Sequence, residues 1–269
     1  MGTSNIRHPI FRETLAQFAV NGGIEFASIA DVPAGTGMGS SSSFTVGLLH
    51  NLYAIRRKLV TKEQLAQKAC EIEIEKLREP IGKQDQYAAA YGGLNMIHFF
   101  PDDSVKVEKI QLNDDFLDEL QKNLILYYAG AQRKASEILK EQKQNIEDGQ
   151  KKDILIEMTH LVNELKATLI KNNMDQFGTL LGRNWKLKKR LAGTITNTKI
   201  DDAYTLAIKN GALGGKLLGA GGGGFLLFYC QKKRQEALTS ALGLRQFNFK
   251  FEHEGSKVIR IIDEKAGYG

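Results

Sequence analysis

The chain has 269 residues, of which 42% are hydrophobic and 25% are charged, and its formal net charge is +6. These values predict a globular protein with a sizeable core, in one large domain or two ordinary ones. No run of about 18 apolar residues occurs, which argues against a membrane-spanning helix. The first residues do not resemble a secretory leader, so we expect a cytoplasmic protein.

The positive balance suits an anionic small substrate. Basic residues are distributed along helix-like segments such as residues 186–190 and are not interleaved with aromatic residues, so no nucleic-acid partner is expected. Cys70 and Cys230 lie far apart in apolar segments, which predicts buried, reduced thiols. The five histidines show no metal-ligand spacing.

In the first half of the chain, apolar periodicity and capping signals predict helices and strands in alternation. Thr61 and Gln64 have the spacing of a capping box that opens one of the helices. The predicted helices are residues 9–20, 44–55, the segment after Thr61 and 83–90, and the predicted strands are residues 24–30, 94–99 and 105–110.

The second half is mostly helical before it ends in strands. The predicted helices are residues 134–144, 152–172, 174–191, 201–210 and 234–242, and the predicted strands are residues 124–128, 225–229, 247–251 and 257–262. We place a domain boundary near residue 120, just before the first of these strands, which gives domains of residues 1–120 and 121–269.

Residues 31–43 form the most informative segment, because three alternating glycines and four serines lead directly into a helix. Such a loop can turn its N–H groups into a cup at a helix N-terminus, where free donors and the helix dipole attract phosphate. The residues predicted to bind phosphate are Pro33, Gly35, Gly37, Gly39, Ser40, Ser41 and Ser42. A plain flexible loop with a serine cap is the alternative, and the spacing fits neither a Walker A loop nor a dinucleotide fingerprint.

A second glycine cluster, residues 219–224, precedes a predicted strand. Glycines in such number lower stability in regular structure, so they indicate a place where the backbone passes close to something. A loop packed against the first glycine segment or a phosphate is the functional interpretation, and a flexible hairpin is the alternative. The predicted contact residues are Gly219, Gly221, Gly222 and Gly223.

Acidic residues lie between the two glycine segments. Glutamates occur at alternate positions of residues 71–75, and Lys83 and Asp85 follow a Pro-Ile-Gly break. A serine hydroxyl with a carboxylate can hold Mg²⁺, and an aspartate can accept a proton from an incoming hydroxyl, helped by a neighbouring lysine. The alternative is a solvated helix end and a surface ion pair.

These pieces resemble the GHMP small-molecule kinases in kind and in order. Residues 33–42 resemble the family's central phosphate motif, residues 216–225 its C-terminal glycine motif, and residues 82–93 the branch that acts on heptose 7-phosphate. The resemblance covers residues 9–263. It implies an α+β fold of two domains, with a ferredoxin-like second domain and ATP bound in the cleft between the domains.

The resemblance also implies roles for individual residues. Asp85 would be the catalytic base, assisted by Lys83, and Ser41 with Glu75 would bind Mg²⁺, with Glu73 as the other choice of glutamate. ATP and Mg²⁺ are the expected cofactors, and a sugar phosphate, phosphorylated at its anomeric hydroxyl, is the expected substrate. Arg133, Trp185 and Lys188 could line the sugar pocket or simply pack on helix faces.

One departure from the family stands out. The family's first motif lies in strands ahead of the helix predicted at residues 9–20, so we expect the first domain to be truncated by roughly 60–80 residues. An exposed strand edge would favour a homodimer. Other open possibilities are a kinase for a hexose or a fucose-like sugar, and an inactive remnant that binds a nucleotide or sugar.

Overall fold

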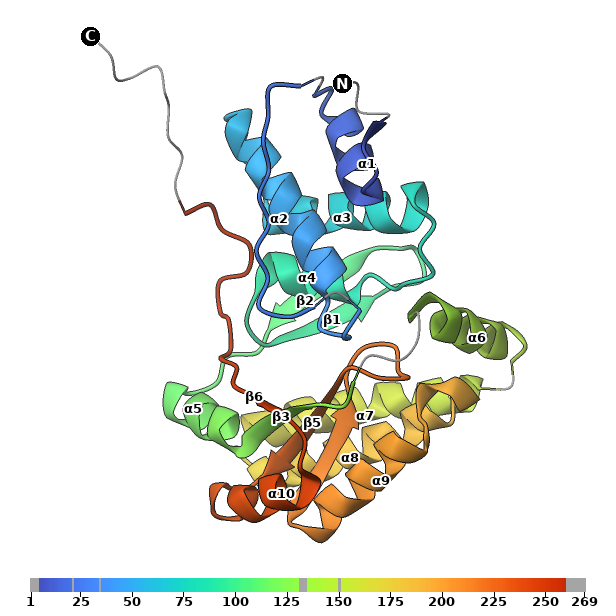
Figure 1. Ribbon diagram of the computed structural model, residues 1–269, viewed down its shortest axis with the longest axis vertical. Coiled ribbons are helices and arrows are strands. Elements are labelled where there is room, and N and C mark those ends of the chain that lie inside the picture. The colour runs from blue at the N-terminus through green and yellow to red at the C-terminus, as the bar shows by residue number, and fades with distance from the viewer. Residues whose placement is uncertain (1–4, 21, 34, 131–134, 150, 260–269) are drawn as a thin grey trace. The chain divides into compact units, whose positions relative to one another are not determined.

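The computed structural model describes residues 5–20, 22–33, 35–130, 135–149 and 151–259. The chain divides into two compact units (Figure 1). Unit 1 holds the residues up to Asp31, Gly39–Lys109 and those from Glu252, and unit 2 holds Val32–Met38 and Ile110–Phe251. The first glycine segment is therefore shared between the units, and the main change of unit comes at residues 109–110; the predicted domain boundary near residue 120 stays a prediction.

Unit 1 consists of helices and one hairpin. Its elements are α1 (Pro9–Gln17), α2 (Ser40–Ile55), α3 (Lys62–Cys70), a π-helix (Glu71–Lys76), α4 (Gln84–Tyr91), β1 (Asn95–Phe99) and β2 (Val105–Lys109). β1 and β2 pair antiparallel, with Ile97 opposite Val107, as the sequence predicts. The predicted capping box is confirmed, because Thr61 Oγ1 accepts from Gln64 N at 3.1 Å and Gln64 Oε1 accepts from Thr61 N at 2.9 Å.

The core of unit 1 lies where α2, α3 and α4 pack together. Val46 and Leu49 of α2, Leu65 and Ala69 of α3 and Ala90 of α4 are fully buried. Their spacing of three or four residues puts them on one face of each helix. This packing fixes α2, which carries the predicted metal ligand Ser41, against α4, which carries the predicted base Asp85.

The predicted strand at residues 24–30 is wrong, because the segment has no regular secondary structure. A strand needs a partner to bond its backbone. Within the described part of unit 1, β1 and β2 pair with each other alone, and Ile29 is 96% exposed.

Unit 2 is a four-stranded sheet with helices. Its elements are α5 (Asp114–Asn123), β3 (Leu124–Tyr128), α6 (Ala135–Glu147), α7 (Lys152–Ile170), α8 (Met174–Lys189), the 3-10 turn η3 (Gly193–Ile195), α9 (Thr198–Lys209), β4 (Ala212–Leu217), β5 (Phe225–Cys230), the 3-10 turn η4 (Lys232–Arg234), α10 (Gln235–Leu242) and β6 (Gln246–Phe247). The sheet order is β4-β5-β3-β6, and every neighbouring pair is antiparallel. In chain order this is a β-α-β-β-α-β arrangement, which confirms the expected ferredoxin-like domain.

β4 is a strand that the sequence did not reveal, because Gly214 and Gly215 are not typical strand residues and interrupt its apolar pattern. A Cβ on Gly214 would overlap the carbonyl oxygen of Gly178 in α8, and a Cβ on Gly215 would overlap the Phe228 ring. Gly214 thus lets α8 lie directly on the sheet (Figure 1), and Gly215 leaves room for the Phe228 ring of the neighbouring strand β5. Trp185 of α8 is fully buried in the core of this unit together with Phe228.

The end of the chain is less regular than predicted. β6 shares only Phe247 with the strand expected at 247–251. Residues 257–259 of the strand expected at 257–262 are not in a strand, and residues 260–262 lie outside the described residues. No helix among the described residues is long and apolar enough to cross a membrane. Cys70 and Cys230 are free and buried.

Candidate functional site

The N-terminus of α2 opens with a glycine. Gly39, its N-cap, has φ +69° and no side chain of its own with which to cap the helix. Glycine is favoured at such a φ because it has no Cβ. The first N–H groups of a helix without a cap are available to an anion, and the helix dipole favours negative charge there.

Ser41 lies in the first turn of α2 and reaches a buried carboxylate. Its Oγ donates to Glu73 Oε1 at 2.5 Å, and Gln86 Nε2 donates to Glu73 Oε2 at 2.8 Å. Glu73 and Gln86 are both fully buried. Gln86 Oε1 is also buried and has no hydrogen-bond partner among the described residues. α2 and the π-helix thus bring a hydroxyl and a carboxylate together, and α4 adds the Gln86 amide that bonds to the same carboxylate.

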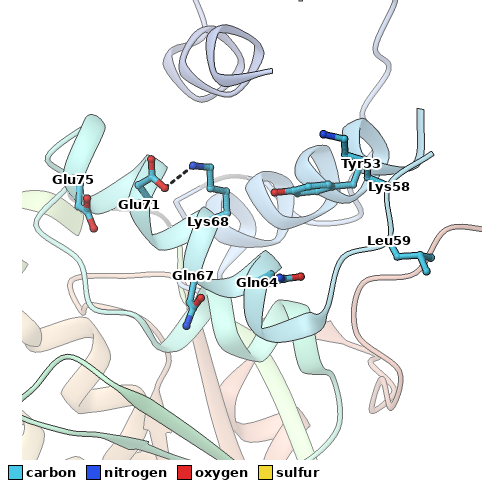
Figure 2. Close-up of a pocket in the computed structure, with 8 residues that line it drawn as sticks. All are labelled: Tyr53, Lys58, Leu59, Gln64, Gln67, Lys68, Glu71 and Glu75. Carbon is cyan, nitrogen blue, oxygen red and sulfur yellow. Dashed lines mark hydrogen bonds and ion pairs between the residues drawn. The ribbon is translucent and has the colours of Figure 1, made fainter. Parts of the chain in front are cut away.

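Glu75, preferred over Glu73 on the sequence, lies elsewhere. It is exposed and, with Glu71, lines a surface pocket of about 500 Å³ (Figure 2). Glu71 is paired there with Lys68 at 2.6 Å. The structure therefore brings Glu73, and not Glu75, to Ser41.

The π-helix decides which glutamate turns inward. Leu77 N donates to Ile72 O at 3.0 Å, an i to i+5 bond that widens the helix after α3. Ile72 and Glu73 are buried, whereas Glu71 and Glu75 remain on the outer side. The preference for Glu75 rested on its place nearest the helix end, which does not show which side chain turns inward.

Asp85 lies at the start of α4, against the N-cap of α2. Its Cγ is 3.4 Å from the point where a Cβ on Gly39 would stand. The carboxyl group is thus next to the positive end of α2, where a negative charge is stabilised. Lys83 does not share this position: its Nζ donates to Asp103 Oδ1 at 2.7 Å, in the turn between β1 and β2.

α4 is held in place by its tyrosines. Tyr87 and Tyr91 donate to the two oxygens of Glu63 in α3, at 2.9 and 2.8 Å. Burial first, and then the bond to Glu63, raises the pKa of Tyr91 to about 12, and the same causes raise the pKa of Tyr87. Both hydroxyls therefore stay protonated donors at neutral pH and fix the helix that carries Asp85.

Within unit 2, the two glycine segments touch each other. A Cβ on Gly37 would stand 2.7 Å from Leu218 O. A Cβ on Gly219 would overlap Gly37, and one on Gly224 would overlap the carbonyl of Thr36. The prediction that the second loop packs against the first is confirmed, and the contact is backbone to backbone.

Two of the three residues suggested for a sugar pocket make other contacts. Trp185 is buried in the core of unit 2. Lys188 Nζ donates to the carbonyl of Gly219, and Arg133 lies outside the described residues. Lys216, at the start of the second glycine motif, donates to Asn184 Oδ1 at 2.9 Å, and burial lowers the pKa of its amino group.

The donor set around Ser41 fits Mg²⁺ with a nucleotide. The described residues contain no cluster of three or more His, Cys, Asp or Glu that could hold a metal by itself. Mg²⁺ does not need one, because it commonly takes one or two protein oxygens and completes its shell with phosphate oxygens and water. The Ser41 hydroxyl and the Glu73 carboxylate are hard oxygen ligands of that kind.

The sequence did not reveal Gln86 and Thr36 as site residues. Gln86 follows Asp85 directly, and its fully buried amide bonded to Glu73 appears only once α4 is packed. Thr36 lies between Gly35 and Gly37 and is almost fully buried, with its Oγ1 donating to Pro33 O at 2.9 Å. The position of Thr36 between two glycines was the signal that could have revealed it, because a threonine hydroxyl bonded to a nearby backbone carbonyl stabilises a tight turn.

Family models match both halves of the chain. The model of the GHMP kinases N terminal domain matches residues 7–93, and that of the GHMP kinases C terminal domain matches residues 165–248. A D-glycero-alpha-D-manno-heptose 7-phosphate kinase from Campylobacter jejuni is 32% identical over 235 residues, which cover 86% of this chain and 69% of that protein.

Two further similar proteins have names that state different sugar substrates. An L-fucokinase/L-fucose-1-P guanylyltransferase from Bacteroides fragilis is 28% identical over 83% of this chain, which spans only 24% of that larger protein. The crystal structure of a D-glycero-D-manno-heptose 1-phosphate kinase from Bacteroides thetaiotaomicron has 25% identity and a TM-score of 0.66, with 92% of this chain and 71% of that one covered.

Proposed function

The chain belongs to the GHMP kinase family, and we propose that it is a sugar kinase that transfers the γ-phosphoryl group of ATP to the anomeric hydroxyl of a heptose 7-phosphate. The observation that carries the proposal is the Ser41 to Glu73 bond of 2.5 Å beside the N-terminus of α2, with Asp85 against the N-cap. Phosphoryl transfer requires these parts: donors for phosphate, oxygens for a metal and a group that orients and deprotonates the hydroxyl.

Phosphate binding is assigned to the first glycine segment. The backbone N–H groups of Ser40, Ser41 and Ser42 at the start of α2 and the hydroxyl of Ser40 hold phosphate oxygens, while Pro33, Gly35, Gly37 and Gly39 shape the loop. The Ser41 hydroxyl is directed to Glu73, and Ser42 is buried, so its hydroxyl is not assigned to phosphate. Gly35 has φ +79° and no other group within 4 Å of where its Cβ would be, which leaves room for a ligand. The second loop, including Gly219, Gly221, Gly222 and Gly223, supports the first.

The metal is assigned to Ser41 and Glu73, with Glu73 replacing Glu75 in the assignment. When bound, Mg²⁺ neutralises charge that develops on the phosphate oxygens. Gln86 keeps the Glu73 carboxylate oriented through its bond to Oε2.

Asp85 is proposed as the group that accepts the proton of the sugar hydroxyl. The start of α2 stabilises its carboxylate, and the tyrosines of α4 hold it in position. Lys83 bonds to Asp103, so we assign it no step, and its predicted help to Asp85 stays a prediction.

The heptose phosphate is supported by the Campylobacter relative and by the net charge of +6. A fucose-like acceptor is the second candidate, supported by the fucokinase relative. The test is ATP consumption with a panel of heptose 7-phosphates, fucose and hexoses, followed by NMR of the product. A heptose 1,7-bisphosphate supports the proposal, whereas turnover of fucose alone favours the second candidate. ATP binding with no turnover of any sugar rejects kinase activity for this chain.

A homodimer and a cytoplasmic location are further proposals. The sheet of unit 1 consists of β1 and β2 alone among the described residues, so no other described strand pairs with its outer edges, which supports self-association. Sedimentation equilibrium tests it: a mass of twice one chain is expected, and the mass of one chain at micromolar concentration rejects it.

A further inference from the structure

α6 is attached to unit 2 mainly by polar contacts. Ile138 is its one buried residue among those described. Most helices in globular proteins are held by a broad apolar face. The position of α6 must therefore depend on the hydrogen bonds that its side chains make.

Three side chains of α6 make these bonds, and all reach the same part of unit 2. Gln142 Nε2 donates to Ala220 O at 3.1 Å, inside the second glycine loop. Asn145 Nδ2 donates to Leu191 O at 2.8 Å. Glu141 accepts from Gly193 N at 2.9 Å and from the hydroxyl of Thr194.

The two segments that α6 contacts are also bonded to each other. Gly222 N donates to Ile195 O at 2.8 Å, and a Cβ on Gly221 would stand 2.8 Å from the Cα of Ile195. Lys188 adds a bond to Gly219 O. Residues 191–195 and 219–224 are therefore hydrogen-bonded to each other, and the side chains of α6 bond to both segments.

The second glycine loop, residues 219–224, in turn holds the first glycine segment in place. Gly219 lies against Gly37 and Gly224 against Thr36, at distances that leave no space for a Cβ. A shift of residues 219–224 must displace the Thr36–Gly37 turn, since close-packed backbone has nowhere to yield.

We propose that Glu141, Gln142 and Asn145 are positioning residues for nucleotide binding: they hold the second glycine loop and, through it, the turn at Thr36 and Gly37. The inference rests on the proposed binding of ATP by the first glycine segment. α6 thus contributes to nucleotide affinity without a role in the transfer itself.

The decisive variant is Gln142→Glu, which keeps the size of the side chain but places an acidic oxygen against the Ala220 carbonyl. We expect KM for ATP to rise about fivefold, the effect of one lost hydrogen bond, while kcat stays within twofold. The Gly222 amide should exchange with solvent faster. Gln142→Lys, which restores a donor, should return both values toward wild type.

The matched control is Lys143→Ala. Lys143 is the next residue of α6, and its Nζ lies 3.8 Å from Glu147 Oε1 on the exposed side. It should change neither KM nor the exchange of Gly222. If Gln142→Glu does not fold, Asn145→Ala takes its place with the same measurements.

Wild-type KM and exchange in Gln142→Glu would overturn the inference, as would equal changes in Lys143→Ala. If calorimetry shows that the wild-type chain does not bind ATP, the proposed function fails, and the nucleotide part of the inference fails with it. Faster Gly222 exchange in Gln142→Glu would then still support α6 as the support of the loop, so the two failures are distinguishable.

Discussion

The two glycine segments have similar composition but opposite surroundings. In residues 219–224, a Cβ on Gly219, Gly221 or Gly224 would overlap backbone atoms of another segment. In the first segment, no described atom beyond the chain neighbours lies within 4 Å of the point where a Cβ on Gly35 would stand, and the nearest atom to that point at Gly39 belongs to the Asp85 side chain. Glycine serves close backbone packing in one loop and leaves open space in the other.

The division between these two uses falls inside the first segment. The Thr36–Gly37 turn is packed against residues 218–224 of unit 2, whereas Gly39 opens α2 of unit 1. A glycine count alone cannot separate the two uses, so substitutions at matched positions are the way to test the difference.

The largest effect is expected at Asp85, whose side chain lies against Gly39 of the first glycine segment. Asp85→Asn should lower kcat about 10²- to 10⁴-fold, because the amide cannot accept the hydroxyl proton. ATP binding should stay within a few-fold. Steady-state kinetics and calorimetry measure both. Asp118→Asn, an exposed change in α5 of unit 2, serves as the control, and a full rate in Asp85→Asn would exclude Asp85 as the base.

In the packed loop, the expected effect is on stability. Gly224→Ala should lower the free energy of unfolding by about 3 kcal/mol, because the new Cβ meets the Thr36 carbonyl at a φ of +104°. Urea denaturation measures it. Gly243→Ala is the matched control: φ is +60° and nothing lies within 4 Å, so about 1 kcal/mol is expected. Equal losses would mean that packing does not distinguish these glycines.

The metal assignment gives a smaller, selective effect. Glu73→Gln and Ser41→Ala should each raise about tenfold the Mg²⁺ concentration at which ATP binding is half-maximal, because each removes a ligand oxygen or its charge. Glu75→Gln should leave the Mg²⁺ titration unchanged, since Glu75 lies in the surface pocket. The reverse result would restore Glu75 as the ligand.

The smallest change in stability is expected at Gly35. Gly35→Ala should cost about 1 kcal/mol, the ordinary strain of a Cβ at φ +79°. Because the surrounding space is open, the main consequence should be a few-fold rise in KM for ATP. A loss as large as that of Gly224→Ala would show that this end of the loop is also packed.

Much of the fold could be predicted from local signals. The capping box of Thr61, the hairpin of β1 and β2 and the helices of unit 2 all rest on short-range patterns that packing preserved. The segment at residues 24–30 failed because strand residues form a strand only with a partner. β4 was missed because Gly214 is required by the contact with α8 and Gly215 by the Phe228 ring of β5, and no local pattern shows such tertiary contacts.

The site was predicted in outline and not in detail. The two loops and Asp85 follow from motif spacing, and the structure places Gly37 against Gly219 and Asp85 against Gly39. The partner of Lys83 depends on the β1–β2 turn, which lies 20 residues further along the chain. The choice between Glu73 and Glu75 depends on a π-helix, a geometry that residue periodicity does not predict.

The π-helix at Glu71–Lys76 affects how this chain is aligned with its relatives. A π-turn corresponds to a one-residue insertion in an α-helix, so a relative with a regular helix here would have one residue fewer before its aspartate. Counting back from Asp85 by a fixed interval would then select the wrong carboxylate. Alignments of this family should place their gap within the widened turn and be anchored on the buried glutamate.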